Sequence, residues 1–313
     1  MSAMDTSDPN THSTSDPNPR RYIDIVANPK GGTGKTTFTL ALIYRLRKAR
    51  PKSQPTSLCE MDSQGKLSRF YPNETTSIRA ALKISEIRED PNKVLAEIDG
   101  IGAKMIEGHC VVDLGANTGE TFWNWWDHRR MNNLLEKKQR KARFWIVTTD
   151  DTESLAGALG VAIAAKAAQQ FHQIIFVQNQ LYGPNFASRS SDNLAALEEL
   201  FRKANPTDGD PVEKRYATNQ PKSHYYHLMS MPRCYSELWT AAQAQHFIPA
   251  QIHGIDPAEA ETKFGISEMQ ALAAVGDYQD WIDTIDRRIG AVIENVAKYI
   301  DETTVEPEKI AAE

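Results

Sequence analysis

The residues from Asn28 to Thr37 constrain the fold more than any other part of the sequence. They read Asn-Pro-Lys-Gly-Gly-Thr-Gly-Lys-Thr-Thr and lie between an apolar run and an amphipathic stretch with helical spacing. Glycines let a backbone curl so that successive N–H groups point inward at phosphate oxygens, and the N-terminus of the next helix adds its positive dipole. The segment therefore predicts a strand, a phosphate-binding loop and a helix, in that order.

Short apolar runs alternate with helical stretches along the rest of the chain. Strands are expected at Tyr22–Asn28, Thr56–Met61, His109–Leu114, Arg143–Thr148, Gln173–Asn179 and Tyr225–Met231. Helices are expected near 34–50, 76–88, 92–107, 119–139, 151–171, 191–204, 235–246 and 266–300. Strands that alternate with helices pair in parallel through right-handed crossovers. We therefore expect an α/β fold: one doubly wound, mostly parallel sheet with helices on both faces.

One domain is expected over residues 21–300, because no clean linker divides that range. Residues 1–20 read as a disordered tail, since they contain almost no large apolar side chain and Thr6–Asn10 repeats as Thr14–Asn18. A partner-binding arm is the alternative for this tail. Residues 205–224, rich in Pro, Asp, Asn and Lys, predict a surface insertion, and 301–313 predict a polar C-terminal tail.

Composition and charge narrow the function classes. The chain has 36 Lys+Arg against 41 Asp+Glu, so its net charge of -5 argues against a protein that coats nucleic acid over its whole surface. The three cysteines form no C-x-x-C pair, which argues against an iron–sulfur or structural zinc site. No run reaches the roughly 18 apolar residues that a membrane span needs, and the N-terminus lacks a signal-peptide pattern. By exclusion, a cytoplasmic location is expected.

Within the phosphate loop, Lys35 is placed to reach the β- and γ-phosphates and the Thr36 hydroxyl to bind Mg²⁺. The loop has Pro29 where the usual pattern has glycine, and Lys30 follows directly. It resembles the deviant Walker A motif of the ParA/MinD family of P-loop ATPases, K-G-G-x-G-K-[ST]. The resemblance implies that Lys30 crosses a dimer interface to the partner's ATP. The residues that it assigns to nucleotide binding in this loop are Lys30, Gly31, Gly32, Thr33, Gly34, Lys35, Thr36 and Thr37.

Two further strands end on candidate acidic residues. The segment Glu60-Met61-Asp62-Ser63-Gln64-Gly65 resembles the family's D-x-D-P-Q-G-N motif, with Glu60 and Ser63 as departures. The resemblance implies that Asp62 orients the attacking water and supports Mg²⁺; a loop-capping aspartate is the alternative. Asp113 closes an apolar strand as a Walker B acid does, and is expected to hold Mg²⁺ through a water.

The residues after Asp113 bear on the biological role. Asp113-Leu-Gly-Ala-Asn lacks the two prolines usual in ParA proteins, and looks closer to ParA-like ATPases of conjugative transfer systems, the TraL group. Gly115 is expected to let this loop move when the γ-phosphate leaves. Tyr182-Gly183-Pro184 also resembles the transfer group. These short matches favour a role in plasmid biology.

Two more residues are assigned to the base pocket. Asn179 ends a strand where the family has an Asn that reads the adenine edge, and an amide suits adenine N6 and N7. A turn-forming asparagine is the equal alternative. Pro232, in Met229-Ser-Met-Pro-Arg, resembles a family proline that lines the pocket.

Three features outside the site can be interpreted in more than one way. Trp123, Trp125 and Trp126 predict either core packing or a nucleotide-sensing interface. The last helix has an apolar stripe that predicts a cap on the core, and its acidic end argues against membrane binding. The basic residues of 129–143 predict a solvated face, non-specific DNA binding or a protein contact, and are Arg129, Arg130, Lys137, Lys138, Arg140, Lys141 and Arg143.

Taken together, the sequence predicts an ATP-dependent dimerisation switch that hydrolyses ATP slowly and is stimulated by a protein partner. Plasmid DNA partition or positioning is the expected role. A ParA-like ATPase of conjugative transfer acting on protein cargo is the alternative. Three other classes are disfavoured: a ligase of the dethiobiotin synthetase kind by Lys30, a non-hydrolysing adaptor by Asp62, and a nitrogenase-type reductase by the lack of a cysteine pair in the switch loops.

Overall fold

The computed structural model describes residues 22–49, 55–78, 91–168, 173–182, 192–193, 195–197, 199 and 226–303. The predicted N-terminal tail at 1–20, the predicted insertion at 205–224 and residues 304–313 of the predicted C-terminal tail lie outside these ranges.

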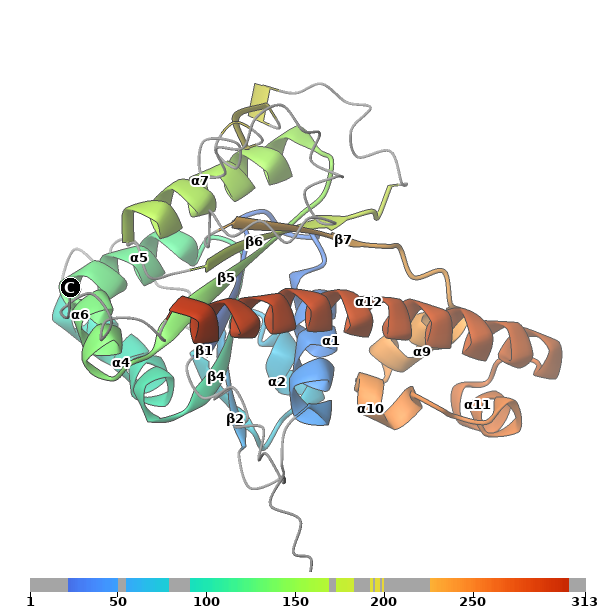
Figure 1. The fold of residues 1–313 in the computed structure, drawn as a ribbon. Coiled ribbons are helices and arrows are strands. Elements are labelled where there is room, and N and C mark those ends of the chain that lie inside the picture. Colours follow the sequence, from blue (N-terminus) through green and yellow to red (C-terminus); the bar gives the residue numbers. More distant parts are fainter. Residues whose placement is uncertain are drawn as a thin grey trace, which may run out of the picture.

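A single parallel sheet forms the centre of the molecule (Figure 1). Its seven strands have the order β3-β2-β4-β1-β5-β6-β7, and every neighbouring pair is parallel. The strands are β1 (Tyr22–Ala27), β2 (Thr56–Met61), β3 (Thr75–Ile78), β4 (His109–Leu114), β5 (Lys141–Thr148), β6 (Gln173–Asn179) and β7 (Tyr226–Met231). The predicted α/β, doubly wound fold is confirmed.

Helices cover both faces of the sheet, and each face has its own apolar core. One core joins the sheet to α4 (Pro91–Glu107), α5 (Gly119–His128), α6 (Met131–Lys137) and α7 (Thr152–Ala168). The other joins it to α1 (Lys35–Lys48), α2 (Lys66–Phe70), α9 (Glu237–Ala244), α10 (Pro249–Ile252), α11 (Pro257–Phe264) and α12 (Glu268–Thr303). Figure 1 shows α12 lying across α1 and reaching out over α9 to α11.

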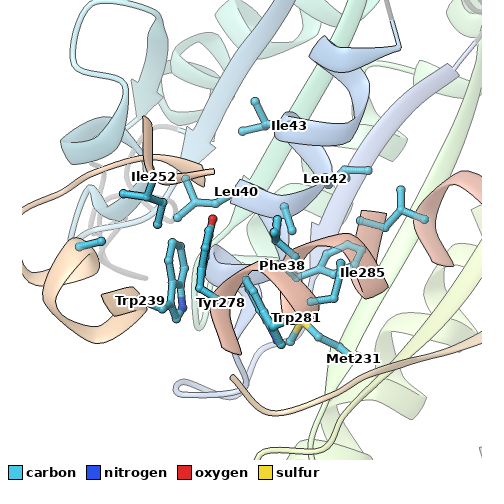
Figure 2. Close-up of a cluster of buried hydrophobic side chains, with 14 of the residues drawn as sticks. Phe38, Leu40, Leu42, Ile43, Met231, Trp239, Ile252, Tyr278, Trp281 and Ile285 are labelled. Carbon is cyan, nitrogen blue, oxygen red and sulfur yellow. The ribbon is translucent and has the colours of Figure 1, made fainter. Parts of the chain in front are cut away.

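The apolar stripe of α12 caps the second core, as predicted. Ile282, Ile285 and Ile289 are fully buried, and Figure 2 shows Tyr278, Trp281 and Ile285 of this helix beside Phe38 of α1. Since α1 follows the phosphate loop directly, this packing fixes the helix on which the loop depends.

The tryptophans after β4 belong to the core of the other face. Trp125 and Trp126 are buried and Trp123 is half-buried. Phe122 packs on all three indole rings, at centroid distances of 5.5 to 5.7 Å. Of the two interpretations left open by the sequence, core packing is the one that the structure bears out.

Two helix predictions were wrong. The range 76–88 was expected to be helical, but Thr75–Ile78 forms strand β3, and 79–88 lie outside the described residues. Among the described strands this edge strand pairs with β2 alone, and its sequence, Thr-Thr-Ser-Ile, lacks the long apolar run that marks a central parallel strand. The range 119–139 is two helices rather than one, because Arg130 adopts a left-handed conformation with φ 50°. The short helices α2, α10 and α11 were not predicted.

The strand order places the ends of β1 and β4 side by side in the middle of the sheet. Val26 pairs with Asp113 in this register. The chain leaves β1 toward β2 on one side, whereas β5 lies on the other. In open α/β sheets such a reversal leaves a crevice at the carboxyl ends of the strands, where ligands bind.

Candidate functional site

The phosphate loop connects β1 to α1 and is shaped by glycines in left-handed conformations. Gly32 has φ 76° and Gly34 has φ 87°, values that residues with a Cβ rarely adopt. A Cβ on Gly34 would also overlap the side-chain amide of Asn179. The predicted strand, loop and helix therefore occur in register, with α1 starting at Lys35.

Lys35 is the buried cation of the loop. Its side-chain Nζ donates to the carbonyl oxygen of Lys30 at 2.7 Å, and the residue is 8% exposed. Burial lowers the pKa of Lys35 to about 8; Asp113 opposes this shift and Lys66 adds to it. The ammonium group is thus held in the loop without a carboxylate within ion-pair distance in the described chain, and an anionic ligand would raise the pKa of Lys35 again.

Thr36 and Asp113 make up the candidate magnesium site. The Thr36 hydroxyl donates to Oδ2 of Asp113 at 3.1 Å. The other oxygen, Oδ1, is buried and has no hydrogen-bond partner among the described residues. Burial raises the pKa of Asp113 to about 7. A hydroxyl beside a carboxylate with an unused oxygen fits the oxygen ligands that Mg²⁺ prefers, and a bound cation would favour the ionised carboxylate.

The two predicted switch segments, which begin at Asp62 after β2 and at Asp113 at the end of β4, touch each other beside this site. The backbone N–H of Gly115 donates to the carbonyl of Met61 at 2.8 Å. A Cβ on Gly115 would lie 2.7 Å from Cγ of Asp62. The Asp62 carboxylate accepts the N–H of Gln64 at 2.9 Å. Gly115 therefore gives Asp62 the room it needs, a packing role that the sequence alone did not indicate.

The side chain of Glu60 holds the first switch segment in place through hydrogen bonds. Its carboxylate is fully buried and accepts the backbone N–H groups of Leu67 and Ser68 at the start of α2, together with the hydroxyl of Ser77. In the sequence Glu60 counted only as a departure from the family motif. The two-residue spacing to Asp62 was the one available signal, and it did not reveal these partners.

Lys30 points away from its own loop. Its side chain is 41% exposed and pairs with Glu153, at the start of α7. Glu153 also raises the pKa of Lys30. The backbone of Lys30 is fixed by Asn28, whose Oδ1 accepts the Lys30 N–H at 2.9 Å, while Nδ2 of Asn28 donates to Val147 in β5. The loop end is thus rigid and the ammonium group is accessible.

Asn179 and Pro232 both lie at the carboxyl ends of their strands. Each takes part in a hydrogen bond to another part of the protein. Nδ2 of Asn179 donates to the carbonyl of Thr33 in the phosphate loop at 2.9 Å. The carbonyl of Pro232 accepts the indole N–H of Trp281 in α12 at 2.8 Å. Asn179 thus supports the loop, and contact of either residue with a base remains a prediction.

The basic segment 129–143 lies at the opposite, amino end of the sheet, where Lys141 pairs with Tyr22 at the start of β1. Inclusion of Arg143 in a surface patch was wrong: its guanidinium is 2% exposed and donates to both oxygens of Asp24, at 2.6 and 2.7 Å. Arg129 is bound to Asp99 in the same bidentate way. The exposed cations of this segment are Arg130, Lys137 and Lys138.

The structure adds three findings on the remaining sequence features. Cys59 and Cys110, distant in sequence, lie on neighbouring strands with their Sγ atoms 3.5 Å apart. Within the described ranges no cluster of three His, Cys, Asp or Glu side chains has the arrangement of a metal site. In the same ranges, none of the helices has the length and apolar character required to span a membrane.

Comparisons with known proteins match this chain to one nucleotide-binding family. The family model described as "CobQ/CobB/MinD/ParA nucleotide binding domain" matches residues 24–302. No curated protein matches the chain. Similar solved structures include a putative plasmid partition protein from Borrelia burgdorferi B31 bound to AMPPNP, with 14% identity, TM-score 0.43, and coverage of 90% of this chain and 99% of that one. The MinD cell division protein of Aquifex aeolicus has 13% identity, TM-score 0.40, and coverage of 86% and 97%. A pNOB8 ParA bound to nonspecific DNA has 11% identity, TM-score 0.41, and coverage of 86% and 99%.

Proposed function

The chain belongs to the CobQ/CobB/MinD/ParA nucleotide-binding family, and on that premise we propose that it is an ATPase that dimerises when it binds ATP. Hydrolysis then returns it to the monomer, so the ATP-bound dimer is the active form. Turnover is slow in the isolated protein and is raised by a protein partner.

One observation carries this proposal: the two lysines of the loop have different environments. Lys35 is buried and directed into its own loop. Lys30 is fixed at its backbone but accessible at its ammonium group, and its partner Glu153 is 74% exposed. Exposed ion pairs contribute only about 0–1 kcal/mol. Lys30 is therefore free to exchange Glu153 for a phosphate of a second subunit.

The chemistry proposed for each subunit follows from the positions of its side chains. Lys35 neutralises charge on the phosphates of its own ATP, and Asp62 orients the attacking water. Thr36 and Asp113 would hold a magnesium ion, which would supply positive charge to offset that of the phosphates. Phosphoryl transfer needs little more than such positioning and charge neutralisation.

The same contacts account for the switch. Moving a population from mostly monomer to mostly dimer requires that ATP favour the dimer by about 5.5 kcal/mol over ADP. A γ-phosphate that meets Lys35 of one subunit and Lys30 of the other would be desolvated on both sides. Charge-assisted contacts of this kind are about twice as strong as neutral ones.

Sedimentation velocity with Mg·ATP and Mg·ADP tests the proposal. The wild type is expected to be a dimer with ATP and a monomer with ADP. Lys30→Ala should keep nucleotide binding but lose the dimer, and Asp62→Ala should keep ATP binding and accumulate the dimer. Glu153→Ala is the matched control, since it removes the ion pair and leaves Lys30 in place. A Lys30→Ala protein that dimerises as the wild type does would contradict the proposal.

Plasmid DNA partition or positioning is the biological role that we propose, with non-specific DNA as the surface to which the dimer binds. One observation favours the alternative of a conjugative transfer ATPase with protein cargo. Two of the seven cations in 129–143 are bound to Asp24 and Asp99, which leaves fewer for phosphates. A gel-shift assay with plasmid DNA, with and without ATP, separates the two roles.

A further inference from the structure

A third lysine lies beside the phosphate site on the first switch segment. Lys66 occupies the position at which the D-x-D-P-Q-G-N pattern ends in asparagine, and it is the first residue of α2. It is half-buried. Its charge acts on the ammonium group of Lys35, as do the charges of Asp62 and Asp113. The turn from Asp62 to Lys66 borders this site, because Asp62 lies against Gly115 and α2 packs against α1, the helix that begins at Lys35.

The backbone around Lys66 is fixed on both sides. Before it, Gly65 has φ 58°, a left-handed conformation that turns the chain from Asp62 into α2. After it, the N–H groups of Leu67 and Ser68 are bound by the buried carboxylate of Glu60. The Ser68 hydroxyl also donates to the carbonyl of Gly65 at 3.0 Å. Lys66 is thus presented on a rigid support rather than on a loose loop.

The charge of Lys66 is not matched by the protein. Within the described chain no ion pair or hydrogen bond involves its ammonium group. A half-buried cation that repels a second cation costs stability unless an anion joins them. The neighbouring site is the one in which the proposed function places a triphosphate.

We propose that Lys66 is a catalytic residue that contacts the γ-phosphate of ATP within its own subunit, and that Glu60 positions it. This inference rests on the proposed function. A cation on the switch segment would bind ATP and not ADP, so it would couple the position of Asp62 to the presence of the γ-phosphate. Three lysines would then surround that group: Lys35 and Lys66 from one subunit and Lys30 from the other.

Calorimetric titration with Mg·AMP-PNP and with Mg·ADP tests this directly, because the ratio of the two affinities reports contact with the γ-phosphate. Lys66→Gln is expected to weaken AMP-PNP binding about 10- to 100-fold, the range for a lost hydrogen bond to a charged group, and to leave ADP binding unchanged. Lys66→Arg should keep most of the preference. Lys137→Gln is the charge control, since it removes an exposed positive charge at the amino end of the sheet, away from the first switch segment.

The outcomes separate this inference from the proposed function. Wild-type protein that binds neither nucleotide would contradict the proposed function itself. Normal wild-type binding with an unchanged affinity ratio in Lys66→Gln, or with equal loss for both nucleotides, would overturn the role of Lys66 alone. Glu60→Gln is expected to lower the ratio less than Lys66→Gln does, and thermal unfolding of each variant shows whether the fold is intact.

Discussion

Two clusters of charged side chains lie at opposite ends of the sheet, and they differ in whether each charge has a partner of opposite sign. At the amino end, Asp24 accepts hydrogen bonds from Arg143 and from the indole of Trp145, and lies 3.0 Å from Nε2 of His109. We call these four residues the amino-end cluster. At the carboxyl end, Lys35, Asp62, Lys66 and Asp113 form the carboxyl-end cluster, in which Oδ1 of Asp113 has no partner among the described residues.

The pKa values of the two aspartates express this difference. Burial by itself would raise the pKa of Asp24, but Arg143 and His109 together hold it well below the ordinary range. Burial raises the pKa of Asp113 to about 7, and Lys35 offsets only part of that effect. Removal of one partner from a buried ion pair is strongly destabilising, whereas buried charges with perturbed pKa values and no such partner are typical of functional sites. The comparison therefore separates a structural cluster from a ligand site.

The largest expected effect is at the amino-end cluster. Arg143→Leu should lower the free energy of unfolding by about 3–5 kcal/mol, since it leaves Asp24 buried without its main partner. Nucleotide affinity of the folded variant should not change. Urea unfolding measures the loss. Arg129→Leu is the control, because its ion pair with Asp99 is 32% and 44% exposed and should contribute about 0–1 kcal/mol.

At the carboxyl-end cluster, removal of a charge should stabilise the nucleotide-free protein. The folded-state pKa of Asp113, about 7, lies above the unfolded value of about 3.9. Its ionisation therefore costs stability increasingly as pH rises from about 4 to 7, after which the cost is constant at roughly 4 kcal/mol. Asp113→Asn should be more stable than the wild type, by more at pH 8 than at pH 5. An equal or smaller gain at pH 8 would contradict the unmatched state of Asp113.

A smaller effect is expected where the two switch segments touch. Gly115→Ala should displace Asp62, since its Cβ would lie 2.7 Å from the carboxylate carbon. A displacement of about 1 Å can cost on the order of 100-fold in rate. ATP hydrolysis should fall while ATP affinity is retained. Gly119→Ala is the control, because a Cβ there would meet nothing within 4 Å. Equal rates in the two variants would exclude this contact as important.

Sequence patterns predicted the local parts of the carboxyl-end cluster and missed the long-range pairings of the amino-end cluster. The phosphate loop was identified because its glycines, Lys35 and Thr36 are consecutive, and strand β4 was predicted because its apolar run ends at Asp113. Arg143 was assigned to the surface because its partner, Asp24, is 119 residues away. The break at Arg130 has no glycine or proline to mark it. Such features depend on which strands become neighbours.

The smallest expected effect concerns DNA. If the exposed cations of 129–143 contact phosphates, replacement of Lys137 and Lys138 with Ala should reduce the dependence of log K on log salt by about 0.9 for each contact removed. ATPase activity should stay the same, since these residues lie at the amino end of the sheet. Fluorescence anisotropy with duplex DNA over a salt series measures the slope. An unchanged slope would favour protein cargo over DNA.

The central claim is that the carboxyl-end cluster binds a nucleotide. Calorimetric titration of the wild type and of Lys35→Ala with Mg·AMP-PNP tests this claim most directly. The wild type should bind one nucleotide per chain. Lys35→Ala should bind more than about 100-fold more weakly, because a buried charge-assisted contact is lost. It should remain folded, since no carboxylate among the described residues forms an ion pair with Lys35. Equal affinity of the two proteins for Mg·AMP-PNP would contradict this claim.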